Sequence, residues 1–121
     1  QMLVNLIKNS IEAIDDLRSS MGSGKPSFIK INCYIKDSFL VIEVIDNGIG
    51  IERDKLEAVF RPGYTTKESG SGLGLHSVAN FVNGCGGQIF ASSEGVGKGA
   101  TMRVTLPITS QALKKACSVR S

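Results

Sequence analysis

The sequence predicts an α+β protein: a two-layer α/β sandwich in which helices cover one face of a mixed, mostly antiparallel sheet. A long amphipathic helical pattern opens the chain, and two pairs of strand patterns follow, each pair joined by a short turn. Because the helical segments alternate with hairpins and not with single strands, the pattern argues against a doubly wound parallel sheet.

The composition is typical of one globular domain. The 121 residues are 41% hydrophobic and 21% charged, which favours a packed core over disorder. The net charge of +3 suits an anionic ligand but does not indicate a nucleic-acid partner. No run of 18 apolar residues and no signal peptide is present, so we expect a cytoplasmic domain without direct membrane contact. The 3 cysteines lack metal or redox spacing, which favours reduced thiols.

The first predicted element is a helix from residue 1 to about Leu17. The remaining surface of this helix is mostly apolar, which is typical of a largely buried helix with one polar edge. A breaker cluster over residues 21–26 ends it. Polar residues recur at three- and four-residue spacing and form that edge: Asn5, Lys8, Asn9, Glu12 and Asp16.

Two hairpins supply the predicted sheet. Residues 28–36 alternate, and residues 39–45 are nearly all apolar, which is typical of a central strand. Residues 88–93 and 100–106 form the second pair, and Pro107 closes the sheet. On the first strand one face carries Ile29, Ile31, Cys33 and Ile35.

Between the hairpins, residues 52–60 fit a short helix and residues 73–82 a longer one that ends in a glycine-rich segment. Residues 61–71 have no periodicity and indicate a loop. We expect residues 1–107 to form one domain, truncated at its N-terminal side, and residues 108–121 to form a C-terminal tail.

Asn5 and Asn9 lie one helical turn apart on the polar edge. A side-chain amide oxygen is a hard, neutral ligand that suits Mg²⁺, an ion that arrives with phosphates. We therefore expect Asn9 to bind the metal, with Asn5 close by. The alternative is that both are exposed polar residues of a surface helix.

Asp46 ends an apolar strand, so its carboxylate is expected to be at least half buried. A buried carboxylate can accept a hydrogen bond from the exocyclic amine of a purine. Gly48 and Gly50 would let the backbone approach the base. A plain Asx turn is the alternative for Asp46. Thr101 could share a water with Asp46, or it could be an ordinary strand residue.

A second glycine segment precedes the predicted helix at residues 73–82. Free amides at a helix N-terminus bind phosphate, and glycines allow close approach. Its glycines are Gly70, Gly72 and Gly74.

The preceding loop contains Thr65, Thr66 and Lys67. Lys67 could neutralise phosphate charge, or it could be a solvated lysine, and the threonines could contact the phosphates. His76 is the only histidine. We favour a partly exposed helix residue over a phosphate contact for it.

Taken together, these segments resemble the catalytic, ATP-binding domain of sensor histidine kinases. That family shares its Bergerat-type fold with gyrase and the mismatch-repair ATPases. The resemblance spans residues 1–107. Residues 3–13 resemble the asparagine box, 46–50 the first glycine box, 59–67 the phenylalanine box and the start of the lid, 70–75 the second glycine box, and 97–101 the last one.

The resemblance implies ATP and Mg²⁺ as cofactors, with Mg²⁺ bound through Asn9, adenine through Asp46, and a lid of about residues 61–71. The second glycine box adds Leu73 and Leu75 to the nucleotide contacts. The resemblance also implies transfer of the γ-phosphate to a histidine on a separate helical dimerisation domain, which this chain lacks, and a response regulator as partner in two-component signalling. Where these kinases often have a basic residue, this chain has Glu12.

The choice between kinase and hydrolase depends on Asn5. The ATPase relatives carry a glutamate four residues before the metal-binding asparagine, and this glutamate acts as a general base on water. Here that position is Asn5, whose amide is not a useful base. The sequence thus favours a kinase over a gyrase-type ATPase. A nucleotide-binding regulatory module without kinase activity is the other alternative, and the full set of glycine boxes argues against it.

Overall fold

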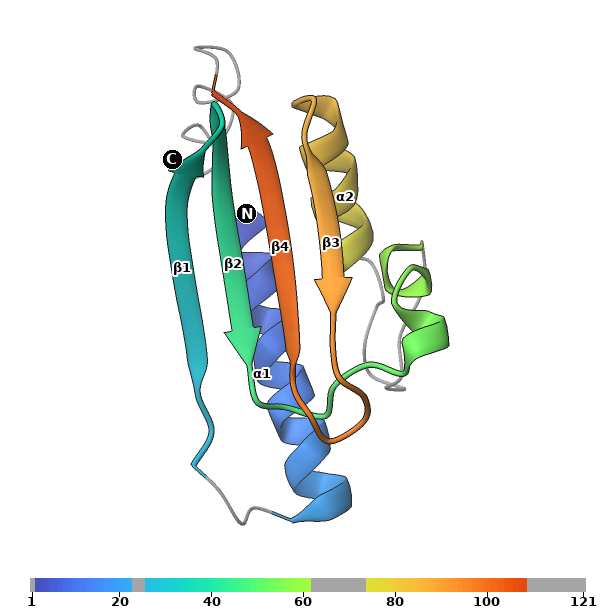
Figure 1. Cartoon of the computed structure of the whole chain (residues 1–121). Helices are drawn as coiled ribbons and strands as arrows, with labels where there is room; N and C mark the ends of the chain where they lie inside the picture. The colour runs from blue at the N-terminus through green and yellow to red at the C-terminus, as the bar shows by residue number, and fades with distance from the viewer. Residues whose placement is uncertain (1, 23–25, 62–73, 109–121) are drawn as a thin grey trace.

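The computed structural model describes residues 2–22, 26–61 and 74–108. Two helices lie on one face of a sheet and leave the other face open (Figure 1), which confirms the predicted two-layer sandwich. Neither described helix is long and apolar enough to cross a membrane. The elements are α1 (Met2–Met21), β1 (Ile29–Lys36), β2 (Phe39–Asp46), the 3-10 turns η1 (Arg53–Lys55) and η2 (Ala58–Phe60), α2 (Gly74–Gly84), β3 (Gln88–Ser92) and β4 (Ala100–Pro107).

The four described strands pair in the order β1-β2-β4-β3, and every pair is antiparallel. β2 is central, as its apolar sequence predicts. In the register of β2 with β4, Asp46 lies opposite Ala100 and Val44 opposite Met102. Because side chains opposite each other point to the same face, these residues share the helix side of the sheet.

The core lies between the sheet and the two helices. On α1 the buried positions recur every four residues, so one narrow stripe of this helix faces the sheet. The buried core cluster consists of Met2, Leu6, Val44, Val78, Val82, Met102, Val104 and Leu106.

The helix α1 differs from its prediction in length and in burial. It continues to Met21, beyond the predicted end at Leu17. Apolar Leu3 and Ile11 are exposed, although we expected most of the apolar surface of this helix to be buried. The reason is geometric: α1 packs on the sheet and α2 from one side, and no other described helix or strand covers the rest of its circumference.

The strand β1 forms one edge of the sheet. Its register places Ile31 opposite Val44, on the helix side, as the alternation predicts. Yet Ile31 is exposed and Ile35 is 69% exposed, because α1 packs mainly on the neighbouring strand β2 and covers little of the edge strand β1 (Figure 1). Cys33 on this strand is an exposed free thiol, and Cys85 is a half-buried free thiol.

Residues 52–60 do not form the single short helix that the sequence predicts. They form the two 3-10 turns η1 and η2. Val59 is buried and Phe60 packs against the core, so the end of this segment is anchored. The tighter 3-10 geometry suits such short pieces of chain.

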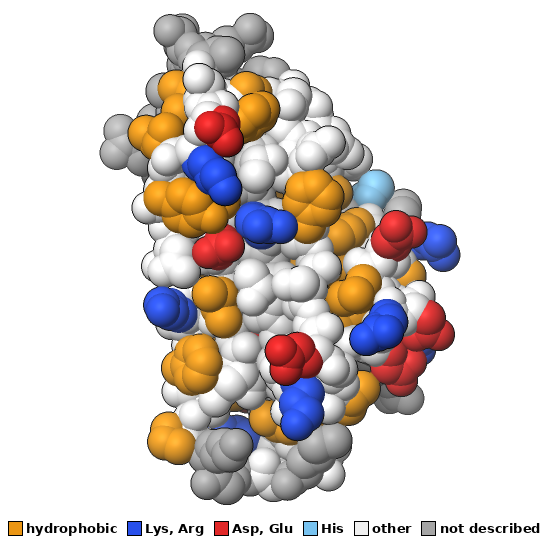
Figure 2. Space-filling model, in the orientation of Figure 1, with side chains coloured by type: hydrophobic (Ala, Val, Ile, Leu, Met, Phe, Trp, Pro, Cys, Tyr) orange, Lys and Arg blue, Asp and Glu red, His pale blue; other side chains and the backbone are white. Residues whose placement is uncertain are grey.

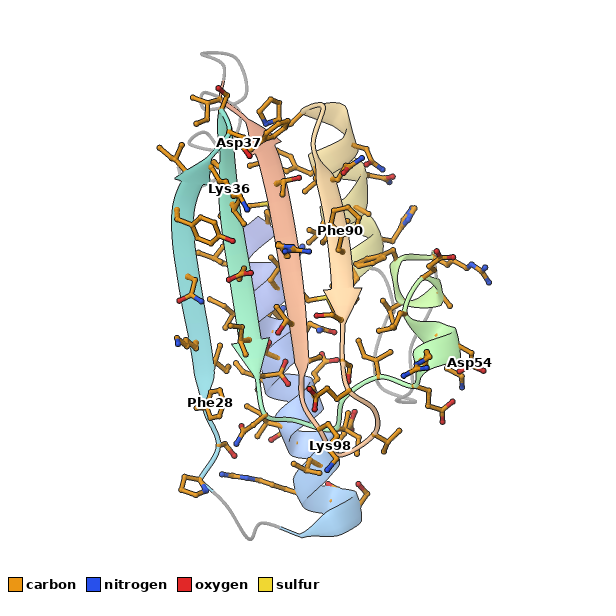
Figure 3. The ribbon with its side chains drawn as sticks, viewed as in Figure 1. Phe28, Lys36, Asp37, Asp54, Phe90 and Lys98 are labelled. Carbon is orange, nitrogen blue, oxygen red and sulfur yellow. The ribbon has the colours of Figure 1, made fainter. Side chains whose placement is uncertain are left out.

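The open face of the sheet carries apolar and charged side chains in a mixed pattern (Figure 2). The Arg103 guanidinium lies 5.8 Å from the ring centroid of Phe90, which is labelled on β3 in Figure 3. Asn32 donates to Glu43 across the β1–β2 pair, with 3.3 Å between Nδ2 and Oε1. Cross-strand side-chain pairs therefore stabilise this face, and none of the described helices packs on it.

Leu6 provides a test of the packing. It is fully buried in α1, so Leu6→Ala is expected to lower the free energy of unfolding by about 2–5 kcal/mol through lost contacts and a cavity. The control is Val4→Ala on the same helix, because Val4 is 53% exposed and should change stability by no more than about 0.5 kcal/mol. Urea denaturation measures both. Equal losses would mean that α1 does not pack as described.

Candidate functional site

Asp46 ends β2 as a buried carboxylate, 4% exposed. The Ser10 hydroxyl of α1 donates to its Oδ2, with 2.9 Å between the oxygens. The Gly48 amide donates to its Oδ1 at 2.9 Å, which is the Asx turn that the sequence offered as the alternative. Asp46 is therefore buried, as predicted, and also forms the Asx turn that was the alternative. Ser10 was not among the predicted site residues.

Burial raises the pKa of the Asp46 carboxyl above its ordinary value, because a carboxylate loses hydration when it is enclosed. Three donors act in the opposite direction: the Gly48 amide, the Ser10 hydroxyl and the Ala100 backbone amide. These groups come from the loop after β2, from α1 and from β4. Asp46 is thus the point at which three parts of the chain meet.

The segment after Asp46, which we call the first glycine loop (residues 47–51), lies between α1 and the hairpin loop (residues 93–99) that joins β3 to β4 (Figure 1). Its Ile49 amide donates to the Ala13 carbonyl of α1 at 2.8 Å. On the other side, the Gly99 amide donates to the Gly48 carbonyl at 3.1 Å, and the Gly97 amide donates to the Ile49 carbonyl. Backbone hydrogen bonds thus fix this loop from both sides.

The glycines of these loops have a packing role that the sequence analysis missed. A Cβ on Gly48 would lie 2.6 Å from the backbone of Ala13. A Cβ on Gly50 would clash with the Gly95 carbonyl, and Gly50 also has a φ of +79°. The structure therefore requires these glycines for close backbone contact within the protein. The approach of a base to Gly48 and Gly50 remains a prediction.

Ser93 connects the two loops. The Ile51 amide donates to its Oγ at 3.1 Å, and this Oγ donates to the Gly99 carbonyl at 2.6 Å. From the sequence alone, Ser93 is predicted only as the end of a strand. The available signal was a hydroxyl residue directly before a glycine-rich turn, where such side chains bond to nearby backbone.

Asn47 holds the chain that leads into β1. Its Oδ1 accepts from the Phe28 amide at 2.9 Å, and its Nδ2 donates to the Pro26 carbonyl at 2.8 Å. Phe28 is labelled just before β1 in Figure 3. The Asn47 side chain therefore links the end of β2 to the residues just before β1, beyond the last backbone pair of the two strands.

Asn5 and Asn9 lie on α1 and are half buried. They occupy positions directly before Leu6 and Ser10, the fully buried residues of the same helix. Because successive helical residues are about 100° apart, the two asparagines share the edge of α1 beside its buried stripe. They are therefore not fully exposed surface residues, which was the alternative for both.

Thr101 does not lie beside Asp46. In the β2–β4 register Ala100 is opposite Asp46, and Thr101 is opposite Ile45. Because side chains alternate along a strand, Thr101 points to the open face of the sheet while Asp46 points to α1. This register corrects the expectation that Thr101 shares a water with Asp46. Thr101 is therefore placed as the ordinary strand residue that was the alternative.

The second glycine segment is described only at its end. Gly74 begins α2, and half-buried Leu75 packs against the core. His76 is half buried, as expected for a partly exposed helix residue, and its Nε2 lies 3.2 Å from the Nδ2 of Asn80 one turn later. The predicted loop contacts lie outside the described residues: Thr65, Thr66, Lys67, Gly70, Gly72 and Leu73.

Among the described residues, no group of three or more His, Cys, Asp or Glu side chains could hold a metal ion. The predicted ligand Asn9 offers one amide oxygen. An amide oxygen is a hard donor of the kind that Mg²⁺ accepts, and this ion usually takes further ligands from phosphates and water.

Comparison with known proteins agrees with this geometry. Residues 1–110 match the family described as histidine kinase-, DNA gyrase B- and HSP90-like ATPase, so the chain belongs to that family. It is 39% identical over 108 residues to the sensor histidine kinase ZraS of Escherichia coli K12, covering 89% of this chain and 21% of that protein. It is 38% identical over 112 residues to sporulation kinase E of Bacillus subtilis 168, covering 93% of this chain and 14% of that protein. The chain thus spans about a fifth or less of these relatives.

The solved catalytic domain of the histidine kinase ThkA has the same fold. The two chains superpose with a TM-score of 0.70 at 29% identity, covering 93% of this chain and 67% of that one. The fold, the family and the relatives therefore agree on the catalytic ATP-binding domain of a histidine kinase.

Gly50 provides a test of the loop packing. Gly50→Ala is expected to lower the free energy of unfolding by more than about 1 kcal/mol, because the methyl group meets the Gly95 carbonyl and alanine disfavours positive φ. The control is Gly84→Ala at the end of α2, where an added Cβ meets nothing within 4 Å. It should remain within about 0.5 kcal/mol of wild type. An unchanged Gly50→Ala protein would contradict the close contact of the two loops.

Proposed function

We propose that this chain binds Mg-ATP beside Asp46 and supplies the γ-phosphate to a histidine on a separate helical dimerisation domain, in two-component signalling. The observation that carries the proposal is the buried Asp46 carboxylate, held by α1 and the first glycine loop in a member of this ATPase family. The relatives' names, sensor histidine kinase and sporulation kinase, support the kinase assignment. A cytoplasmic location and a response regulator as partner follow from the same proposal.

Adenine recognition is assigned to Asp46. A carboxylate only accepts hydrogen bonds, through about four lone-pair positions. Ser10, Gly48 and Ala100 donate to it from the protein. The acceptor capacity that remains suits one N–H of the exocyclic amine of adenine. Guanine presents a carbonyl at the equivalent position, which a carboxylate would repel.

Phosphate binding is assigned to Asn9 and to the second glycine segment. The Asn9 amide oxygen would hold Mg²⁺, and the amides near Gly74 at the start of α2 would face the phosphates. When bound, the metal supplies charge neutralisation on the phosphate oxygens. Asn5 and Asn9 are the side chains of α1 that we place next to the reacting phosphates.

Transfer to histidine is favoured over hydrolysis because α1 offers Asn5 where a base would be required to activate water. In the proposed step an imidazole nitrogen of the acceptor histidine attacks the γ-phosphorus. A nitrogen–phosphorus bond forms, the bond to the β–γ bridging oxygen breaks, and ADP leaves with the electron pair. The role of this chain is to position ATP and stabilise charge.

Asp46→Asn tests adenine recognition. It replaces a pure acceptor by a group that also donates, so the affinity for ATP is expected to fall about 10-fold or more. The control is Asp37→Asn, because Asp37 is exposed in the β1–β2 turn, at the end of the sheet opposite to Lys98 and the hairpin loop (Figure 3). Calorimetry with Mg-ATP and Mg-GTP measures both variants. Equal affinity of the wild type for the two nucleotides would contradict the adenine assignment.

The acceptor is tested with γ-labelled ATP. The only histidine of this chain, His76, lies in α2 beside Asn80 and is not the proposed acceptor. The chain alone should therefore remain unlabelled. Addition of the dimerisation domain of a related sensor kinase should give acid-labile label on that domain. Label on His76 would overturn the proposal, and rapid phosphate release without any acceptor would favour a gyrase-type ATPase.

A further inference from the structure

Ser10 has an unusual position for a polar side chain. It lies in the middle of α1, in the stripe that includes Leu6 and Ile14, and it is 0% exposed. A buried hydroxyl is costly unless it is hydrogen-bonded. Its partner here is Asp46, 36 residues away in the sequence, with 2.9 Å between Ser10 Oγ and Asp46 Oδ2.

The donors to Asp46 differ in kind. Gly48 and Ala100 donate from the backbone, so their positions are set by the loop and by the β2–β4 register. Ser10 donates from a side chain, and it binds the oxygen that the Gly48 amide does not bind. Ser10 is therefore the side chain that holds Oδ2 and opposes rotation of the carboxylate plane.

We propose that Ser10 is a positioning residue that determines how strongly this site prefers a purine with an exocyclic amine. The inference rests on the proposed ATP-binding function and adds a residue to it. Ser10 does not touch the nucleotide in this proposal. It orients Asp46 so that the remaining acceptor direction points to the amine.

The protonation of Asp46 supports the same role. Burial raises the pKa of the Asp46 carboxyl, and the Ser10 hydroxyl opposes that rise because it bonds to the charged form. Without the hydroxyl, the pKa of the Asp46 carboxyl is expected to rise further. A protonated carboxyl presents its own donor and is then a poorer partner for an amine.

The test compares ATP with purine riboside 5′-triphosphate, which has the same phosphates and sugar but no exocyclic amine. The wild type is expected to bind ATP about 10-fold or more tightly than the analogue, the value of a hydrogen bond to a charged group. Ser10→Ala should weaken the binding of ATP by a similar factor and change the affinity for the analogue by less than about 2-fold. The ratio of the two affinities should therefore fall towards one. The control is Ser20→Ala, because Ser20 is exposed on the same helix and bonds only to the Asp16 carbonyl in the described contacts.

A purely structural role for Ser10 predicts equal weakening of both nucleotides, and this result would overturn the proposal. An unchanged preference in Ser10→Ala would overturn it as well. If the wild type bound neither nucleotide, the proposed function itself would fail, which is a distinguishable outcome. Should Ser10→Ala not fold, Ser10→Cys keeps the side-chain shape with a weaker donor and should give an intermediate preference. A wild-type preference in a folded Ser10→Cys protein would then count against the proposal.

Discussion

The arrangement of this domain depends on one constraint: the Asp46 carboxylate is enclosed, and enclosure of a charged group is tolerated only when its oxygens receive hydrogen bonds. Ser10 and Gly48 provide these bonds from α1 and from the loop after β2. The helix therefore has to lie over the end of β2 with Ser10 facing inward. The apolar residues on the same stripe of α1, such as Leu6, then fall onto the sheet.

Direct contacts between backbone segments also hold the site in place. The first glycine loop bonds to Ala13 of α1 on one side and to Gly97 and Gly99 of the hairpin loop on the other. Such contacts need residues without a Cβ at Gly48 and Gly50. The candidate site is thus built on segments whose backbone positions are determined by several partners at once, which is the preorganisation that a binding site requires.

The two faces of the sheet have different roles. The helix side holds the core and Asp46, whereas the open side carries Arg103 over Phe90 and the Asn32–Glu43 pair. Thr101 directly follows Ala100, which lies opposite Asp46. Because successive side chains of a strand point to opposite faces, Thr101 points to the open side. A residue can therefore be adjacent to the site in sequence and yet point away from it.

By itself, the sequence determined the order of the elements, the central position of β2 and the burial of Asp46, because periodicity and turn residues act over short distances along the chain. It also carried the motifs that indicated the family. Only the tertiary structure decided that Ser10 bonds to Asp46, that Thr101 does not, and that the glycines are needed for contact with Ala13 and Gly95. These facts depend on strand register and on which stripe of α1 meets the sheet. The physical reason is that contacts between distant segments, such as Ser10 and Asp46 at a separation of 36 residues, are set by packing, and no local pattern in the sequence encodes them.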